Sequence, residues 1–362
     1  MPDLSGTFAD PIAGYHDWPA FLDGAGLAPG PEVLPGAASL LGVPRPLPVG
    51  EVRREQPVVS AGVAHTRLSW SVGFGPDMAA WLCHPVDADP ARLPGVLYLP
   101  SHGGLKEVGA ERLLDLPGLP DWLLAYRSGE GGRGAASALA ARGVTVVVPD
   151  SFTWGARRFD LRPPDGVRPD HATFEVLAAE HEDVLAKYCL DLGTTYAGMV
   201  AHDDLSALQV LRRLAAPGEI GVIGFSGGGG RAAALGALAP VVGRVVVAGM
   251  MSTLRSLVPA HTGRHSWLLH VPGLASGPDL PGLAAAARRH RLMVVYGEAD
   301  PLFPLAGMRA ADAALVEAFR GATGEYRAVW HPGGHEFGVA EQEVAFDFLT
   351  GHSDAGRSPS AG

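Results

Sequence analysis

Three residues that could form a nucleophilic triad each follow an apolar segment of the chain. Ser226 lies in the pattern G-x-S-x-G, which predicts a serine on a sharp turn between a strand and a helix. Such a turn lifts the serine oxygen away from the backbone, where a base and a substrate can reach it. Asp300 and His335 follow two later apolar segments. A serine becomes a nucleophile when a histidine accepts its proton and an acid orients that histidine, so these residue types predict acyl-transfer chemistry.

The order of the three residues strengthens this interpretation. Serine, acid and histidine follow one another at separations of 74 and 35 residues, which is the order expected of α/β-hydrolases and not of other serine hydrolases. Two alternatives remain. His331 is the second candidate base, although it precedes a proline and leaves less loop to reach Ser226. Glu298 is the second candidate acid, ranked below Asp300.

A hydrolytic serine also needs backbone donors for the oxyanion that develops on the substrate. The N–H of Gly227, directly after the serine, is the first candidate. The second donor is expected from a loop after an earlier strand, and the segment His102-Gly103-Gly104 lies at such a place. We predict Gly104 as this donor, with Gly103 as the alternative, whereas a plain glycine-rich turn is the structural explanation of the same pattern.

Three competing motifs fail on inspection. The glycines at 227–230 formally match a dinucleotide fingerprint, but the acidic residue expected about 20 positions later is missing. Neither Gly-Lys-Ser nor Gly-Lys-Thr is present to complete a phosphate-binding loop. His181-Glu182 lacks the second histidine of a zinc-protease helix. The sequence therefore predicts no cofactor and no metal.

Strand and helix patterns alternate along most of the chain. The expected strands cover residues 67–74, 78–84, 96–99, 144–148, 220–225, 244–248, 292–296 and 326–330. The expected helices cover residues 135–142, 199–214, 229–238, 308–319 and 339–349. Such alternation predicts an α/β fold with a mostly parallel central sheet, helices on both faces and an antiparallel hairpin at its N-terminal edge. Active sites in such sheets lie at the carboxyl ends of the strands, where the candidate triad is expected.

The pattern divides the chain into three parts. Residues 1–50 are rich in Pro and Gly and predict an extension draped over the main domain. Residues 51–352 form the α/β domain, in which 151–195 is an insertion that is either a lid or a solvated helix. Residues 353–362 are small and polar and predict a disordered tail.

Composition restricts the classes of function. A hydrophobic content of 47% with 18% charged residues indicates a globular chain. The net charge of −10 without a basic run argues against a nucleic-acid partner. Two cysteines, no secretory signal and no long apolar stretch predict a cytoplasmic protein without a membrane partner. The oligomeric state remains open.

Residues 96–349 carry a series of motifs that resemble a known superfamily. The motifs are S-H-G-G-L-K-E at 101–107, V-P-D at 148–150, W-G-A-R-R at 154–158, G-F-S-G-G at 224–228, G-M-M-S-T at 249–253, G-E-A-D-P-L-F-P at 297–304 and H-E-F at 335–337. The segment resembles the α/β-hydrolase superfamily and, more narrowly, its dienelactone-hydrolase-like and acetyl-xylan-esterase-like branch. Dienelactone hydrolases carry a cysteine nucleophile where this chain has serine.

The resemblance implies hydrolysis of a carboxylic ester, with a small ester, lactone or thioester as substrate. An acyltransferase or cyclase in metabolite tailoring would use the same triad, and a non-catalytic binding protein is the third alternative. Residues that could line the substrate pocket are His102, Trp154, Arg157 and Trp267, although packing explains the last three equally well.

Overall fold

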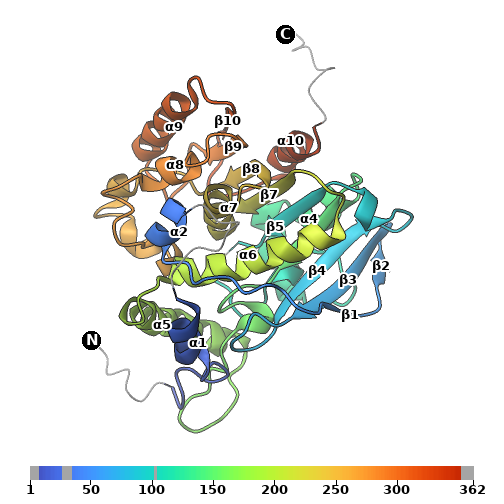
Figure 1. Ribbon diagram of the computed structural model, residues 1–362, viewed down its shortest axis with the longest axis vertical. Helices are drawn as coiled ribbons and strands as arrows, with labels where there is room; N and C mark the ends of the chain where they lie inside the picture. The colour runs from blue at the N-terminus through green and yellow to red at the C-terminus, as the bar shows by residue number, and fades with distance from the viewer. Residues whose placement is uncertain (1–7, 27–34, 102–103, 352–362) are drawn as a thin grey trace.

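The computed structural model describes residues 8–26, 35–101 and 104–351, and a mixed sheet of ten strands runs through its centre (Figure 1). Six strands form the parallel part of the sheet. In spatial order they are β6 (Thr145–Pro149), β5 (Gly95–Leu99), β7 (Ile220–Phe225), β8 (Val242–Ala248), β9 (Arg291–Gly297) and β10 (Glu325–His331). The strands β5, β6 and β7 are buried along their whole length, because helices cover both faces of the sheet.

The remaining strands form an antiparallel edge. They are β1 (Arg53–Arg54), β2 (Val58–Ser60), β3 (Val63–Trp70) and β4 (Met78–Pro85). β4 pairs with β6 and so joins this edge to the parallel strands. Because β5 lies between β6 and β7, the strand order reverses there, and this is where α/β sheets open a crevice for ligands.

Helices cover both faces of the sheet. One face is covered by α6 (Tyr196–Leu214), α7 (Gly227–Leu238), α8 (Asp279–Ala284) and α9 (Leu305–Phe319). The other face is covered by α4 (Ala135–Ala140) and α10 (Val339–Thr350). Four further segments lie outside these layers: α1 (Trp18–Ala25), α2 (Pro35–Leu41), α3 (Asp121–Tyr126) and α5 (His171–Asp191).

The predicted α/β architecture is confirmed, including the antiparallel N-terminal edge. The strand predicted at 220–225 has these bounds in the structure, and the other predicted elements agree to within a few residues. The strand predicted at 67–74 instead covers 63–70, because the chain turns away after Trp70 and Gly75 donates its N–H to Asp17. The short strands β1 and β2 were not predicted.

The N-terminal segment packs into the main core. Tyr15 and Trp18 are both fully buried, and the Tyr15 ring stacks on Phe159 with their centroids 4.0 Å apart. Thr194 and Thr195, just before α6, donate hydrogen bonds to the carbonyls at the end of α2. This segment therefore contributes to the packing of the domain and does not only cover it.

The predicted insertion at 151–195 contains α5, a helix of 21 residues. α5 packs against α6 and against the short 3-10 turn Trp267–Leu269. Among the described helices, none is long and apolar enough to cross a membrane.

Candidate active site

Ser226 lies on a strained turn between β7 and α7. Its backbone has φ 53° and ψ −126°, a conformation that side-chain-bearing residues rarely adopt. The two glycines of the motif are required by close backbone contact. A Cβ on Gly224 would lie 2.2 Å from the carbonyl carbon of Gly228, and a Cβ on Gly228 would lie 2.2 Å from the carbonyl oxygen of Leu99. The motif therefore lets α7 start directly against β5 and β7.

A continuous chain of hydrogen bonds joins the three predicted triad residues. Ser226 Oγ lies 2.9 Å from His335 Nε2, and His335 Nδ1 lies 2.7 Å from Asp300 Oδ2. Both contacts are satisfied when Nδ1 carries the proton, so that Nε2 accepts from the serine hydroxyl. The Asp300 side chain is 1% exposed and that of His335 is 19% exposed, so the acid is enclosed while the histidine ring is partly accessible.

Aromatic packing holds the imidazole of His335 in this orientation. Its ring centroid lies 4.8 Å from that of Phe225, the residue before the nucleophile. Phe225 in turn stacks on Phe337 at 6.1 Å. A Cβ on Gly249 would lie 2.7 Å from the Phe225 ring and 3.5 Å from His335, so this glycine leaves room for both rings.

The two alternative residues point elsewhere. His331 Nδ1 accepts the N–H of Gly333 within its own turn, at 3.2 Å. Glu298 is exposed and forms an ion pair with Arg309 at 2.6 Å. Of the candidate bases and acids, the structure thus brings only His335 and Asp300 to Ser226.

The two predicted oxyanion donors belong to different elements of the fold. Gly227 is the first residue of α7, where backbone N–H groups have no partner within the helix. Gly104 lies in the loop after β5 with φ 70°, and a Cβ there would meet nothing within 4 Å, so its backbone borders open space. His102 and Gly103, the other predicted residues of this loop, lie outside the described residues.

Comparison with known proteins shows the fold. No family model and no curated protein matches the chain. A protein from Bacteroides fragilis, provisionally assigned as an acetyl xylan esterase, superposes with a TM-score of 0.61 at 17% identity, covering 82% of this chain and 72% of its own. An acetyl xylan esterase from Paenibacillus sp. R4 has a TM-score of 0.53 at 18% identity, covering 94% of this chain and 96% of its own. A glucuronoyl esterase from Solibacter usitatus has a TM-score of 0.54 at 16% identity, covering 84% of this chain and 86% of its own.

This chain has an α/β-hydrolase fold. The similarity and the order of the strands both confirm the predicted resemblance at the level of the fold. In this α/β-hydrolase fold, the three triad candidates follow β7, β9 and β10 at the carboxyl ends of parallel strands.

A cleft of about 650 Å³ lies between α5 and the segment that contains the 3-10 turn Trp267–Leu269. Gly104, of the predicted oxyanion loop, and His265 both line it. The His265 ring lies 4.8 Å from that of Phe303, which itself lies 6.5 Å from His335. Burial lowers the pKa of His265 to about 4, so this ring is neutral at neutral pH.

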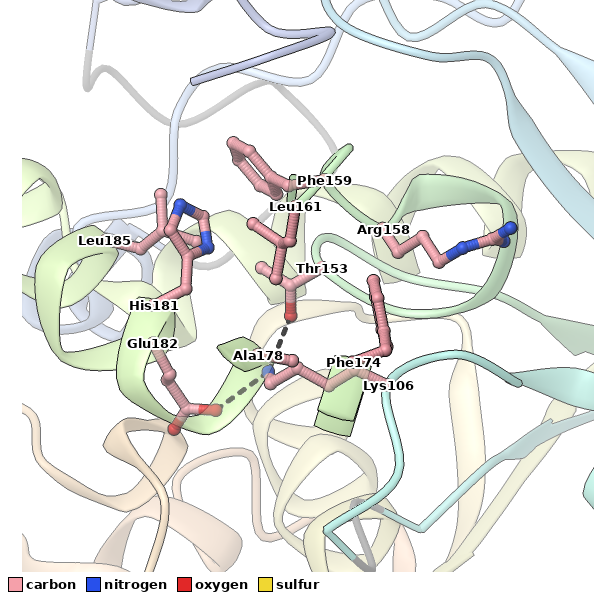
Figure 2. Close-up of a pocket in the computed structure, with 10 residues that line it drawn as sticks. All are labelled: Lys106, Thr153, Arg158, Phe159, Leu161, Phe174, Ala178, His181, Glu182 and Leu185. Atoms are coloured by element: carbon pink, nitrogen blue, oxygen red, sulfur yellow. Dashed lines mark hydrogen bonds and ion pairs between the residues drawn. The ribbon is translucent and has the colours of Figure 1, made fainter. Parts of the chain in front are cut away.

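Lys106 lines both this cleft and a smaller inner cavity. Its Nζ lies 2.7 Å from Glu182, 2.8 Å from Thr153 and 2.5 Å from Tyr196, and it sits 3.8 Å above the Trp154 ring. Burial lowers the pKa of Lys106, although the Glu182 carboxylate opposes this. Figure 2 shows the inner cavity, of about 10 Å³, which is room for a single water molecule. Neither Lys106 nor Glu182 was predicted as a site residue.

The three remaining pocket candidates differ in position. Trp267 is half-buried and lines the cleft. Trp154 is 5% exposed and lies beneath Lys106. Arg157 is fully buried. Its Nε forms an ion pair with Asp203 Oδ2 at 3.0 Å, and its Nη1 donates to the carbonyls of Phe74 and Pro76.

Two guanidinium nitrogens of Arg157, Nε and Nη1, bind groups of the protein, whereas Nη2 has no hydrogen-bond partner among the described residues. Although burial disfavours a charged carboxyl, the Arg157 guanidinium and His202 together outweigh this effect and lower the pKa of Asp203. Arg157 therefore joins the loop before β4 to α6, and we do not propose that it touches a substrate.

One group of potential metal ligands occurs in the part of the chain that the structure describes. It comprises Glu107, His171 and Glu175. Their ligand atoms already have partners, since His171 Nδ1 lies 2.5 Å from Glu107 and both oxygens of Glu175 accept backbone N–H groups. These contacts explain the cluster as a set of hydrogen bonds.

Proposed function

We propose that this protein is a serine hydrolase that cleaves a carboxylic ester through a covalent acyl-enzyme. The observation that carries the proposal is the hydrogen-bonded chain from Asp300 through His335 to Ser226, with the serine on a strained turn. Strain at this position is a feature of nucleophilic turns, because it exposes the oxygen to both base and substrate.

In the first half of the reaction, Ser226 Oγ attacks the ester carbonyl carbon and its proton passes to His335 Nε2. The C=O double bond opens to an oxyanion, which the N–H groups of Gly227 and Gly104 receive. The positive end of the α7 dipole favours the same charge. The C–O bond to the alcohol then breaks, and the leaving oxygen takes the proton from His335 Nε2.

In the second half, water donates a proton to His335 Nε2 and attacks the acyl carbon. The bond to Ser226 Oγ breaks, the serine regains the proton and the acid is released. Asp300 remains ionised throughout and stabilises the positive imidazole. The cleft that Gly104 lines, of about 650 Å³, is large enough for a small-molecule ester, and esterases are among the proteins that share this fold.

The experiment that tests the proposal compares wild type with Ser226→Ala on p-nitrophenyl esters of increasing acyl length. We expect Ser226→Ala to lower kcat by up to ~10⁶-fold, because the triad acts as a unit. Ser276→Ala, at an exposed serine that bonds the carbonyl of Gly273, is the matched control and should keep full activity. Mass spectrometry should find a fluorophosphonate on Ser226 in the wild type.

Full ester hydrolysis by Ser226→Ala would overturn the proposal. Absence of both hydrolysis and fluorophosphonate labelling in the wild type would instead support a binding protein. Adding an alcohol as a competing acceptor, with mass analysis of the products, separates hydrolysis from acyl transfer.

A further inference from the structure

Two carboxylates of α5 hold the same residue of the loop that follows β5. Glu175 accepts the backbone N–H of Lys106 at 2.6 Å and that of Glu107 at 2.9 Å. Glu182 binds the Lys106 side chain at 2.7 Å. Residues seven positions apart lie about two turns apart on the same side of a helix. One side of α5 thus binds both the main chain and the side chain of Lys106.

The carbonyl groups of the same loop have a different partner. Arg112 is fully buried and donates to the carbonyls of Ser101 at 2.7 Å, Leu105 at 2.7 Å and Val108 at 2.6 Å. N–H groups of the loop are therefore held by Glu175 and its carbonyls by Arg112. Both sets of bonds involve an ionised partner, which makes them shorter and stronger than neutral hydrogen bonds.

The peptide groups held in this way lie next to Gly104. Lys106 is only two residues beyond Gly104, so only the backbone torsions of Leu105 and Gly104 lie between the held Leu105–Lys106 peptide and the Gly104 N–H. Glu175 and Gly104 also line the same cleft. The Glu175 side chain is 12% exposed, and each of its two oxygens accepts a main-chain bond.

We propose that Glu175 is a positioning residue for the oxyanion-binding loop, and that α5 is a fixed wall of the active site rather than a lid. The inference rests on the proposed function, because it assumes that Gly104 donates to an oxyanion. Opening α5 would break the Glu175 bonds and separate the buried pair Lys106–Glu182. A buried charge that loses its partner is strongly destabilising, so a Lys106 that stays buried favours the docked position of α5.

Glu175→Gln tests the proposal with little change of shape. A glutamine has one oxygen where Glu175 has two acceptors, so its NH₂ group must face one of the two N–H donors. We expect kcat to fall roughly 10- to 100-fold, less than the 100- to 1000-fold typical of losing an oxyanion donor outright. KM should stay within about threefold, because the substrate carbonyl gains its charge only in the transition state.

A boronic acid, which forms a tetrahedral anion on the serine, separates positioning from a merely structural role. Its Ki should rise by about the same factor as kcat falls. A variant that is only partly folded would lower the number of active sites without changing Ki, and titration with a fluorophosphonate counts those sites.

Glu180→Gln is the matched control, since it makes the same change at an exposed position of α5. If Glu175→Gln does not fold, Glu175→Asp carries the test: it keeps the charge, but its shorter side chain cannot reach both N–H groups. The inference alone would be overturned if the wild type is active and labelled at Ser226 while the kcat and Ki of Glu175→Gln lie within about twofold of those of Glu180→Gln. Loss of the proposed function would appear separately, as full activity of Ser226→Ala.

Discussion

Replacing Asp300 by asparagine should invert the proton arrangement of the triad. Asp300 Oδ1 accepts the N–H of Leu302 at 2.8 Å, while Oδ2 accepts from His335 Nδ1 at 2.7 Å. In Asp300→Asn the amide oxygen stays opposite the Leu302 N–H, because an NH₂ group there would face another donor. The NH₂ group is then directed at His335 Nδ1, which must lose its proton to accept it. The proton moves to Nε2, which faces Ser226 Oγ at 2.9 Å and can no longer act as a base.

The expected magnitude is large for so small a change. A triad histidine in the wrong tautomer lowers kcat by ~10⁴-fold in serine proteases, and each tenfold corresponds to about 1.36 kcal/mol of activation free energy. We therefore expect Asp300→Asn to raise the barrier by about 5.4 kcal/mol. The melting temperature should change little, because the side-chain volume and the bond to Leu302 are both retained.

The assay is kcat on the best p-nitrophenyl ester, together with the rate of fluorophosphonate labelling of Ser226. Glu298→Gln is the control: it neutralises the nearby exposed carboxylate that pairs with Arg309, and it should retain wild-type kcat. Asp300→Asn with more than a tenth of wild-type kcat would refute the assignment of Asp300, as would a strong loss in Glu298→Gln.

Two further predictions concern a glycine of the nucleophile turn and the buried carboxyl of Asp150. Gly228→Ala should destabilise the protein by about 1–3 kcal/mol and lower kcat, because the new Cβ would lie 2.2 Å from the Leu99 carbonyl oxygen. Gly230→Ala is the control, because its Cβ would meet only Met250 at 3.4 Å. Equal melting temperatures of the two variants would contradict the steric argument. The buried Asp150 carboxyl accepts the N–H groups of Ala110 and Ala156. Burial raises the pKa of Asp150 to about 7. The folded state thus binds a proton more tightly than the unfolded state, so this group's contribution to stability is present below about pH 4 and is lost as pH rises through 7. Urea unfolding at pH 5 and pH 8 measures this as the difference in free energy of unfolding between wild type and Asp150→Asn. The advantage of the wild type should be smaller at pH 8, and an unchanged or larger advantage would contradict the raised pKa of Asp150.

The elements that could be predicted from the sequence are those with strong local signals. The strand at 220–225 is a continuous apolar run that ends at a glycine-flanked serine, and its bounds agree with the structure. β1 and β2 have two and three residues and are held by pairing with β3, so no local periodicity marks them. The strand predicted at 67–74 begins and ends four residues earlier in the structure, at 63–70. Contacts with the N-terminal segment, such as the bond from the Gly75 N–H to Asp17, determine where it ends.

The candidate site divides in the same way. Ser226, Asp300 and His335 are predictable because each chemical type follows an apolar strand, and parallel strands bring their carboxyl ends to one edge. Arg157 follows a strand in the same manner, but its partner Asp203 comes from α6, and this buried pairing is invisible in the local sequence. Glu175 is one charged residue among many on α5, and no pattern distinguishes it from Glu180.

The sequence by itself determined the order of strands and helices and the residue types available at the strand ends, because both depend on short-range periodicity and turn chemistry. The sequence ranked His335 above His331, and the tertiary structure decided between them, because His335 Nε2 lies 2.9 Å from Ser226 Oγ whereas His331 Nδ1 accepts a bond within its own turn. It also decided that the α5 carboxylates bind the loop beside Gly104, since contacts across 69 residues depend on how the helix docks.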